Sequence, residues 1–124
     1  MSRPPVAPPG WPDAVRPPGA PDWERTAIGW LFDLCPPDFR GYDVLRRYPV
    51  VLAHLAGSCV TGAVIATEQG IRTVRHDLRE VVPPETVDEA VATYERERLR
   101  LQACARSVDL VARAMRGERW AARL

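Results

Sequence analysis

The chain has 124 residues, of which 46% are hydrophobic and 27% charged, and its formal net charge is +1. This length allows one domain at most, and the near balance of charges gives no overall field toward nucleic acid or a membrane, so we expect neither as a partner. The three cysteines, Cys35, Cys59 and Cys104, form no CxxC pair and no metal-ligand spacing with histidine. We therefore expect free thiols in a reducing cytoplasm, without a disulfide framework, a metal or another cofactor.

The basic residues are all arginine, seventeen in number, and neither lysine nor asparagine occurs. Both missing residues need A-rich codons, so this bias is typical of a GC-rich genome. An alternative interpretation is a surface built for phosphate recognition, because the guanidinium fork matches phosphate geometry.

Residues 1–22 contain eight of the thirteen prolines. Proline fixes φ and removes a backbone donor, so the accessible states are coil and polyproline II. We expect residues 1–21 to form a disordered arm, with ligand-like polyproline II as the alternative. Residues 22–117 then form the helical domain, and residues 118–124 a basic C-terminal tail.

A first helix is expected to begin with Asp22 as its cap and to end at the Cys35-Pro36-Pro37 sequence. Its apolar side chains recur at helical spacing and favour docking on a larger core. A connector at residues 37–41 and a short helical stretch at residues 42–48 follow.

Two long helices are predicted at residues 49–82 and 85–115, with the fold-back at Pro83-Pro84. Each carries apolar or small residues at alternating spacings of four and three, which is a heptad pattern. The two patterns pair about the double proline, with Val60 opposite Val108 and Val81 opposite Val87. The sequence therefore predicts an antiparallel, coiled-coil-like helical hairpin.

The predicted fold class is all-α, a long helical hairpin with the short N-terminal helix packed on it. Residues 50–66 are apolar nearly all round the helix, so we expect a homodimer that completes a four-helix bundle. The residues expected at the dimer or partner interface are Trp23, Trp30, Leu34, Gly57, Val60, Val64, Ile71 and Val108.

Residues 48–67 contain no acidic side chain, lysine or arginine, and twenty such residues can span a bilayer. Glycine, proline and polar residues interrupt the run, so a buried core helix explains it as well. Membrane association stays an alternative.

No set of residues carries a recognisable chemistry, and we expect no enzyme. His54 and Cys59 project from different sides of the helix, and no Glu-x-x-His pair or glycine-rich phosphate loop occurs. Two arginine groups are candidate contacts for phosphate or an acidic partner. They are Arg72, Arg75 and Arg79 near the fold-back, and Arg113, Arg116 and Arg119 near the C-terminus.

Two segments, residues 22–40 (DWERTAIGWLFDLCPPDFR) and residues 81–85 (VVPPE), resemble a family of small, uncharacterised helical proteins from GC-rich actinobacteria. The resemblance implies a bacterial cytoplasmic setting and no activity. Our leading hypothesis is a non-enzymatic interaction or regulatory protein that binds itself or a protein partner through bundle contacts. The alternatives are a small-molecule or nucleotide sensor that uses the arginine groups, and the membrane-associated protein.

Overall fold

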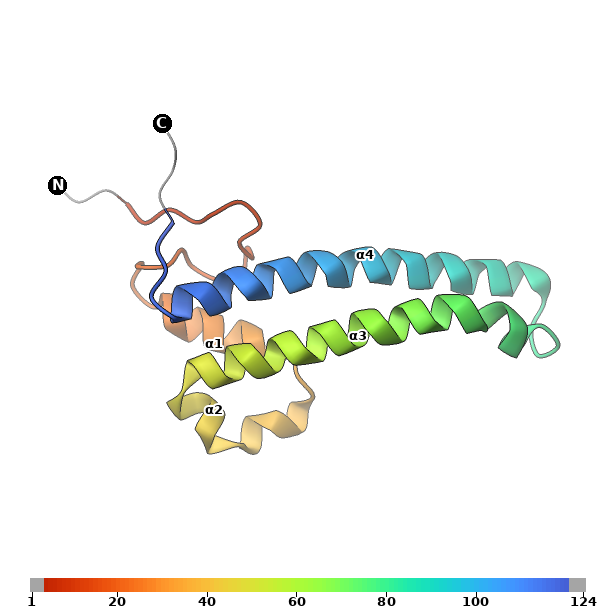
Figure 1. Cartoon of the computed structure of the whole chain (residues 1–124), viewed down its shortest axis with the longest axis horizontal. Helices are drawn as coiled ribbons and strands as arrows, with labels where there is room; N and C mark the ends of the chain where they lie inside the picture. Colours follow the sequence, from red (N-terminus) through yellow and green to blue (C-terminus); the bar gives the residue numbers. More distant parts are fainter. Residues whose placement is uncertain (1–3, 121–124) are drawn as a thin grey trace.

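The structure is a computed structural model that describes residues 4–120. Its helices, in chain order, are α1 (Trp23–Asp33), the 3-10 helix η1 (Pro37–Gly41), α2 (Asp43–Arg47), α3 (Pro49–Leu78) and α4 (Pro84–Met115). Helices α3 and α4 run antiparallel along the long axis, and α1 and α2 lie beside one end of this hairpin, here called the base (Figure 1). The described residues contain no strand. The predicted all-α hairpin with a short N-terminal helix on it is confirmed.

The turn between the long helices lies before the double proline and not on it. Helix α3 ends at Leu78, and Pro84 is the first residue of α4, after an extended Pro83 with ψ 153°. Proline suits this first position because its fixed φ is helical and the missing donor has no intrahelical partner there. Val81 is 73% exposed in the turn, so its predicted pairing with Val87 is wrong.

The register of the hairpin moves by about one helical turn as a result. A Cβ on Gly57 would lie 3.6 Å from Val108, three residues before the predicted partner Val60. At the other end Arg75 reaches Asp88. The seams themselves are right, since their central residues are buried. These are Ala53, Val60, Thr67 and Val74 in α3 and Val87, Leu101 and Val108 in α4.

The core of the molecule sits at the base of the hairpin. Leu31 of α1, Leu52 of α3 and Val111 of α4 are all fully buried in one cluster. Val74 and Val87, nearer the turn, are buried but lie outside that cluster. The far half of the hairpin is therefore only two helices thick.

Two arginines hold η1 and α2 against α1. Arg40 donates to Asp33 at 2.6 Å, and its guanidinium lies 5.4 Å from the centre of the Phe32 ring. Arg46 lies 4.9 Å from the same ring. These cation–π contacts hold the segment over α1, while Leu45 of α2 is buried in the core.

The proline-rich arm departs from the disorder that we expected. Residues 4–21 follow a course of turns along the base of the hairpin (Figure 1), and Val15 is only 3% exposed. The Trp11 indole donates to the carbonyl of Val15 at 2.9 Å, and the Ser107 hydroxyl of α4 donates to the carbonyl of Gly10 at 2.7 Å. Prolines leave the unfolded arm few conformations to lose, so a few buried side chains are enough to order it.

Asp22 does not cap α1 as predicted. Its backbone is left-handed, with φ 66°, and its side chain makes no capping hydrogen bond. Its carboxylate lies 3.5 Å from Arg25 instead. At the other end of the chain the predicted basic tail is described only over residues 118–120, and Arg123 lies outside the described residues.

Candidate functional site

One face of the hairpin has an open groove of about 580 Å³ between α3 and α4, at the base. Its lining includes the small residues Gly57 of α3 and Ala105 and Ala112 of α4, and also polar side chains, among them Asp109 and Arg116. Ile65 also lines it and is 60% exposed. Ile65 follows the fully buried Ala56 by nine residues, or two and a half helical turns, so the two side chains point to opposite sides of the helix. Ile65 therefore lies on the side of α3 away from the core.

Most residues predicted at a dimer interface are used inside this one chain. Trp23, Val60 and Val108 are buried in the core cluster. Three more, Trp30, Leu34 and Val64, are half-buried and pack against the same cluster. Of the remaining two, Gly57 lines the groove and Ile71 is half-buried in the seam.

The two most exposed apolar side chains within α3 and α4 are not among the residues predicted at an interface. Ile65 and Leu99 are 60% and 63% exposed, and both fall outside the heptad seams. Helix α3 is long and apolar enough to cross a membrane, yet only 28% of its most apolar window is buried. The sequence signal that could have identified these exposed residues is an apolar residue between seam positions, because such a residue faces neither the partner helix nor the core.

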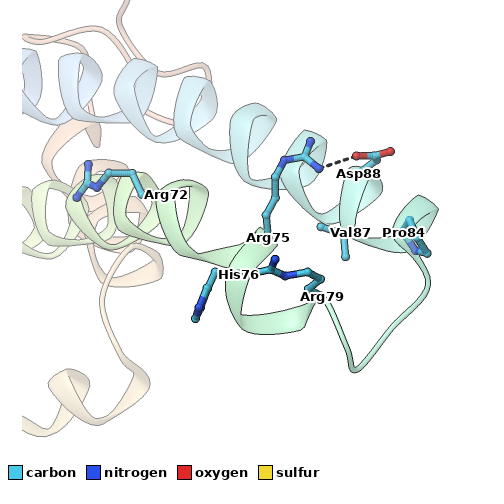
Figure 2. A pocket seen from close by; sticks show the side chains of 7 residues that line it. All are labelled: Arg72, Arg75, His76, Arg79, Pro84, Val87 and Asp88. Atoms are coloured by element: carbon cyan, nitrogen blue, oxygen red, sulfur yellow. Dashed lines mark hydrogen bonds and ion pairs between the residues drawn. The ribbon is translucent and has the colours of Figure 1, made fainter.

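The three arginines of α3 come together near the turn, as their spacing predicted. Arg72, Arg75 and Arg79 line a hollow of about 490 Å³ with His76 (Figure 2). Pro84, Val87 and Asp88 of α4 complete its lining. Arg75 donates to Asp88 at 2.8 Å and so joins the two helices across the hollow. We call this site the tip hollow.

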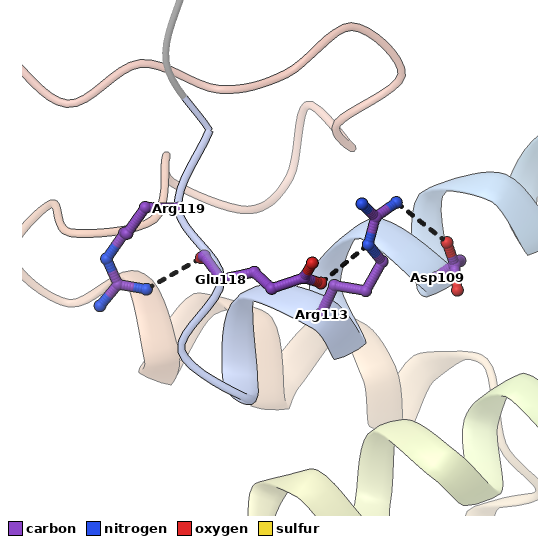
Figure 3. A network of polar contacts seen from close by, with 4 residues as sticks. All are labelled: Asp109, Arg113, Glu118 and Arg119. Carbon is purple, nitrogen blue, oxygen red and sulfur yellow. Dashed lines mark hydrogen bonds and ion pairs between the residues drawn. The ribbon is translucent and has the colours of Figure 1, made fainter.

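Of the C-terminal arginines, Arg113 and Arg119 line one hollow with Trp120, next to Glu118. Arg113 donates to Glu118 at 2.8 Å and lies 3.6 Å from Asp109, and Arg119 donates to the Glu118 carbonyl (Figure 3). The hydrogen bond to Glu118 raises the pKa of Arg113. Arg116 lines the groove. Acidic partners within the chain therefore already hold Arg113.

Two of the three thiols have raised pKa values. Burial, together with the neighbouring Cys59 thiol, raises the pKa of Cys35 to about 11, and burial also raises the pKa of Cys104. A thiol with a raised pKa stays protonated at neutral pH and is a poor nucleophile. Among residues 4–120, no group of three or more His, Cys, Asp or Glu side chains is arranged to hold a metal ion.

The groove and the tip hollow are two of several hollows on the described surface, and another of about 520 Å³ lies between the arm and α4. The groove and the tip hollow lie at opposite ends of the hairpin. No protein-family model, curated protein or solved structure matches this chain.

Proposed function

We propose that the protein is a non-enzymatic helical interaction protein that forms a homodimer through the groove between α3 and α4. The observation that carries this proposal is an exposed Ile65 beside a floor of small residues. The low burial of the apolar part of α3 points the same way. Soluble proteins rarely leave such a surface uncovered unless a partner binds there.

The shape of the groove suits a helix from a second copy. Gly57, Ala105 and Ala112 allow a helix backbone to approach closely, and two hairpins packed on these faces make a four-helix bundle. Burying one Ile65 side chain contributes about 1.5–3 kcal/mol. A two-fold interface uses each contact twice, so the same side chain contributes again from the partner.

Light scattering coupled to size-exclusion chromatography, at several protein concentrations, tests the dimer. We expect the wild-type chain to have twice the monomer mass and Ile65→Glu to be a monomer, because a carboxylate would be desolvated in the interface. Leu99→Glu is the matched control. It places the same charge at an equally exposed apolar position of α4 that does not line the groove, and should leave the mass unchanged.

A wild-type chain that stays monomeric at every concentration would contradict the proposal. So would a Leu99→Glu variant that dissociates as readily as Ile65→Glu, because the groove would then not be the contact.

A membrane-associated role is the second candidate, since α3 has the length and composition of a membrane span. Against it, α4 packs along α3 and carries ion pairs such as Arg75–Asp88 and Arg100–Glu97. Charged groups in the hydrocarbon region are costly. We therefore propose a cytoplasmic dimer in place of a membrane protein, and full recovery of the chain without detergent would rule out the membrane role.

A further inference from the structure

The tip hollow gathers positive charge on one helical face. Arg72, Arg75, His76 and Arg79 are spaced three, one and three residues apart, so they share one side of the last turns of α3. Figure 2 shows Arg75 extended toward α4, the Arg79 guanidinium beside His76, and Arg72 on an earlier turn of α3 with its guanidinium directed toward the base. Pro84 and Val87 of α4 give the hollow an apolar wall.

The acidic groups near this hollow do not match its positive charge. Asp88 is the one carboxylate in its lining, and Arg75 already binds it. Neither Arg72 nor Arg79 has a carboxylate within ion-pair distance in the part of the chain that the structure describes. Asp77 and Glu80 line a neighbouring hollow that His76 and Arg79 also line, and Asp77 lies 3.3 Å from the imidazole. The lining of the tip hollow itself has three arginines and one carboxylate, an excess of positive charge.

Stabilisation of the helix end does not account for the whole arrangement. Cations near a helix C-terminus interact favourably with its dipole, and this explains Arg75 and Arg79. The effect falls off within the last turn, and Arg72 lies six residues before Leu78, the last residue of α3. It also gives no reason for a hollow with an apolar wall from α4.

We propose that the tip hollow binds the phosphoryl group of a small molecule, held by Arg72 and Arg79. Guanidinium groups bind phosphate oxygens through two parallel hydrogen bonds, and a volume of about 490 Å³ has the size of a small-molecule site. Val87 and Pro84 offer contact to an organic part of the ligand. Arg75 is held in place by Asp88 and adds charge. This binding is independent of the dimer, because the groove lies at the other end of the hairpin.

Isothermal titration with inorganic pyrophosphate at constant ionic strength tests the proposal. We expect binding to the wild-type chain that is weakened roughly tenfold or more in Arg79→Ala and in Arg72→Ala. Arg96→Ala is the matched control, because it removes the same charge from an exposed position of α4 outside the hollow. Its affinity should equal that of the wild type.

Asp88→Asn should change the affinity for pyrophosphate in the opposite direction. Removing the carboxylate frees Arg75 and takes away a competing anion, so pyrophosphate should bind more tightly. Absence of binding to the wild type at millimolar pyrophosphate would overturn the proposal, as would equal loss in Arg79→Ala and Arg96→Ala. Ile65→Glu should bind pyrophosphate normally, so failure of the dimer and failure of this site are separate results.

Discussion

Gly70 of α3 allows a tyrosine from α4 to lie across the helix backbone. A Cβ on Gly70 would lie 2.5 Å from Cε1 of the Tyr94 ring. Gly29, in the middle of α1, has no atom within 4 Å of the corresponding position. Both glycines weaken their helices by propensity, but only Gly70 is needed for packing.

This difference predicts opposite results for the same substitution. Gly29→Ala should raise the free energy of unfolding by up to about 1 kcal/mol, through helix propensity alone. Gly70→Ala should lower it, because the new methyl group displaces the Tyr94 ring. Urea unfolding measures both, and a Tyr94→Ala background should restore the gain at Gly70. Equal stabilisation by the two single substitutions would show that the ring does not pack against α3.

Sequence spacing identified the facing residues but not their partners. Tyr94 was correctly placed on the seam of α4, whereas its contact with Gly70 depends on the register, which moved with the turn. In the same way Cys35 and Cys59 are brought together only because α1 packs on α3. Contacts between distant segments need the tertiary arrangement, which periodicity within one helix does not contain.

At the scale of elements, the proline-rich arm acts as a fifth segment of the core. Val15 is 3% exposed, whereas Val6 in the same arm is 46% exposed. The arm also contributes Trp11, whose ring centre lies 6.2 Å from that of Trp23. Proline content alone suggested disorder, but burial of the few apolar residues between the prolines orders the arm.

Val15→Ala should therefore lower the free energy of unfolding by about 2 kcal/mol, from lost burial and a residual cavity. Val6→Ala is the same chemical change at an exposed site of the same arm and should have little effect. Chemical denaturation followed by tryptophan fluorescence measures both. If the two variants were equally stable, the arm would not be part of the folded core.

The helices themselves were largely predictable, and the turn was not. Apolar periodicity located α1, α3 and α4 to within a few residues of their observed bounds. The double proline marked a break correctly, but proline is accepted both in turns and at a first helical position. Tertiary packing chose the second role for Pro84, and this shifted the pairing of the two long helices.

For the molecule as a whole, stability is concentrated at the base. The core cluster draws on the arm, α1, α2 and the base halves of α3 and α4. Toward the turn, the hairpin extends beyond the shorter helices (Figure 1). Few buried contacts support the backbone there, so local opening should require less free energy.

Amide hydrogen exchange should show this gradient directly. Residues 52–60 of α3 and 101–111 of α4 should exchange slowest, while residues 70–78 and 84–91 should exchange faster by local opening. Mass spectrometry of peptides from exchanged protein resolves these regions. Uniform protection along both helices would mean that the hairpin unfolds only as one unit.

The fold of the whole molecule also explains why most of the predicted interface residues pack inside one chain. The sequence showed more apolar surface than two helices can bury, and a second copy was the predicted cover. Helices α1 and α2 cover one side of α3 instead, and the arm lies along α4, so Trp23 and Val60 are core residues. Only the opposite side, with Ile65, was left for a partner.

The turn at residues 79–83 joins two halves that meet again in a single core at the far end of the hairpin. Val81 in this turn is largely exposed, so its packing does not fix the length of the turn. The entropic cost of a longer loop also grows only slowly with added residues. Evolution or design can therefore lengthen this connection, or carry an additional module on it, while the packed base keeps its present arrangement.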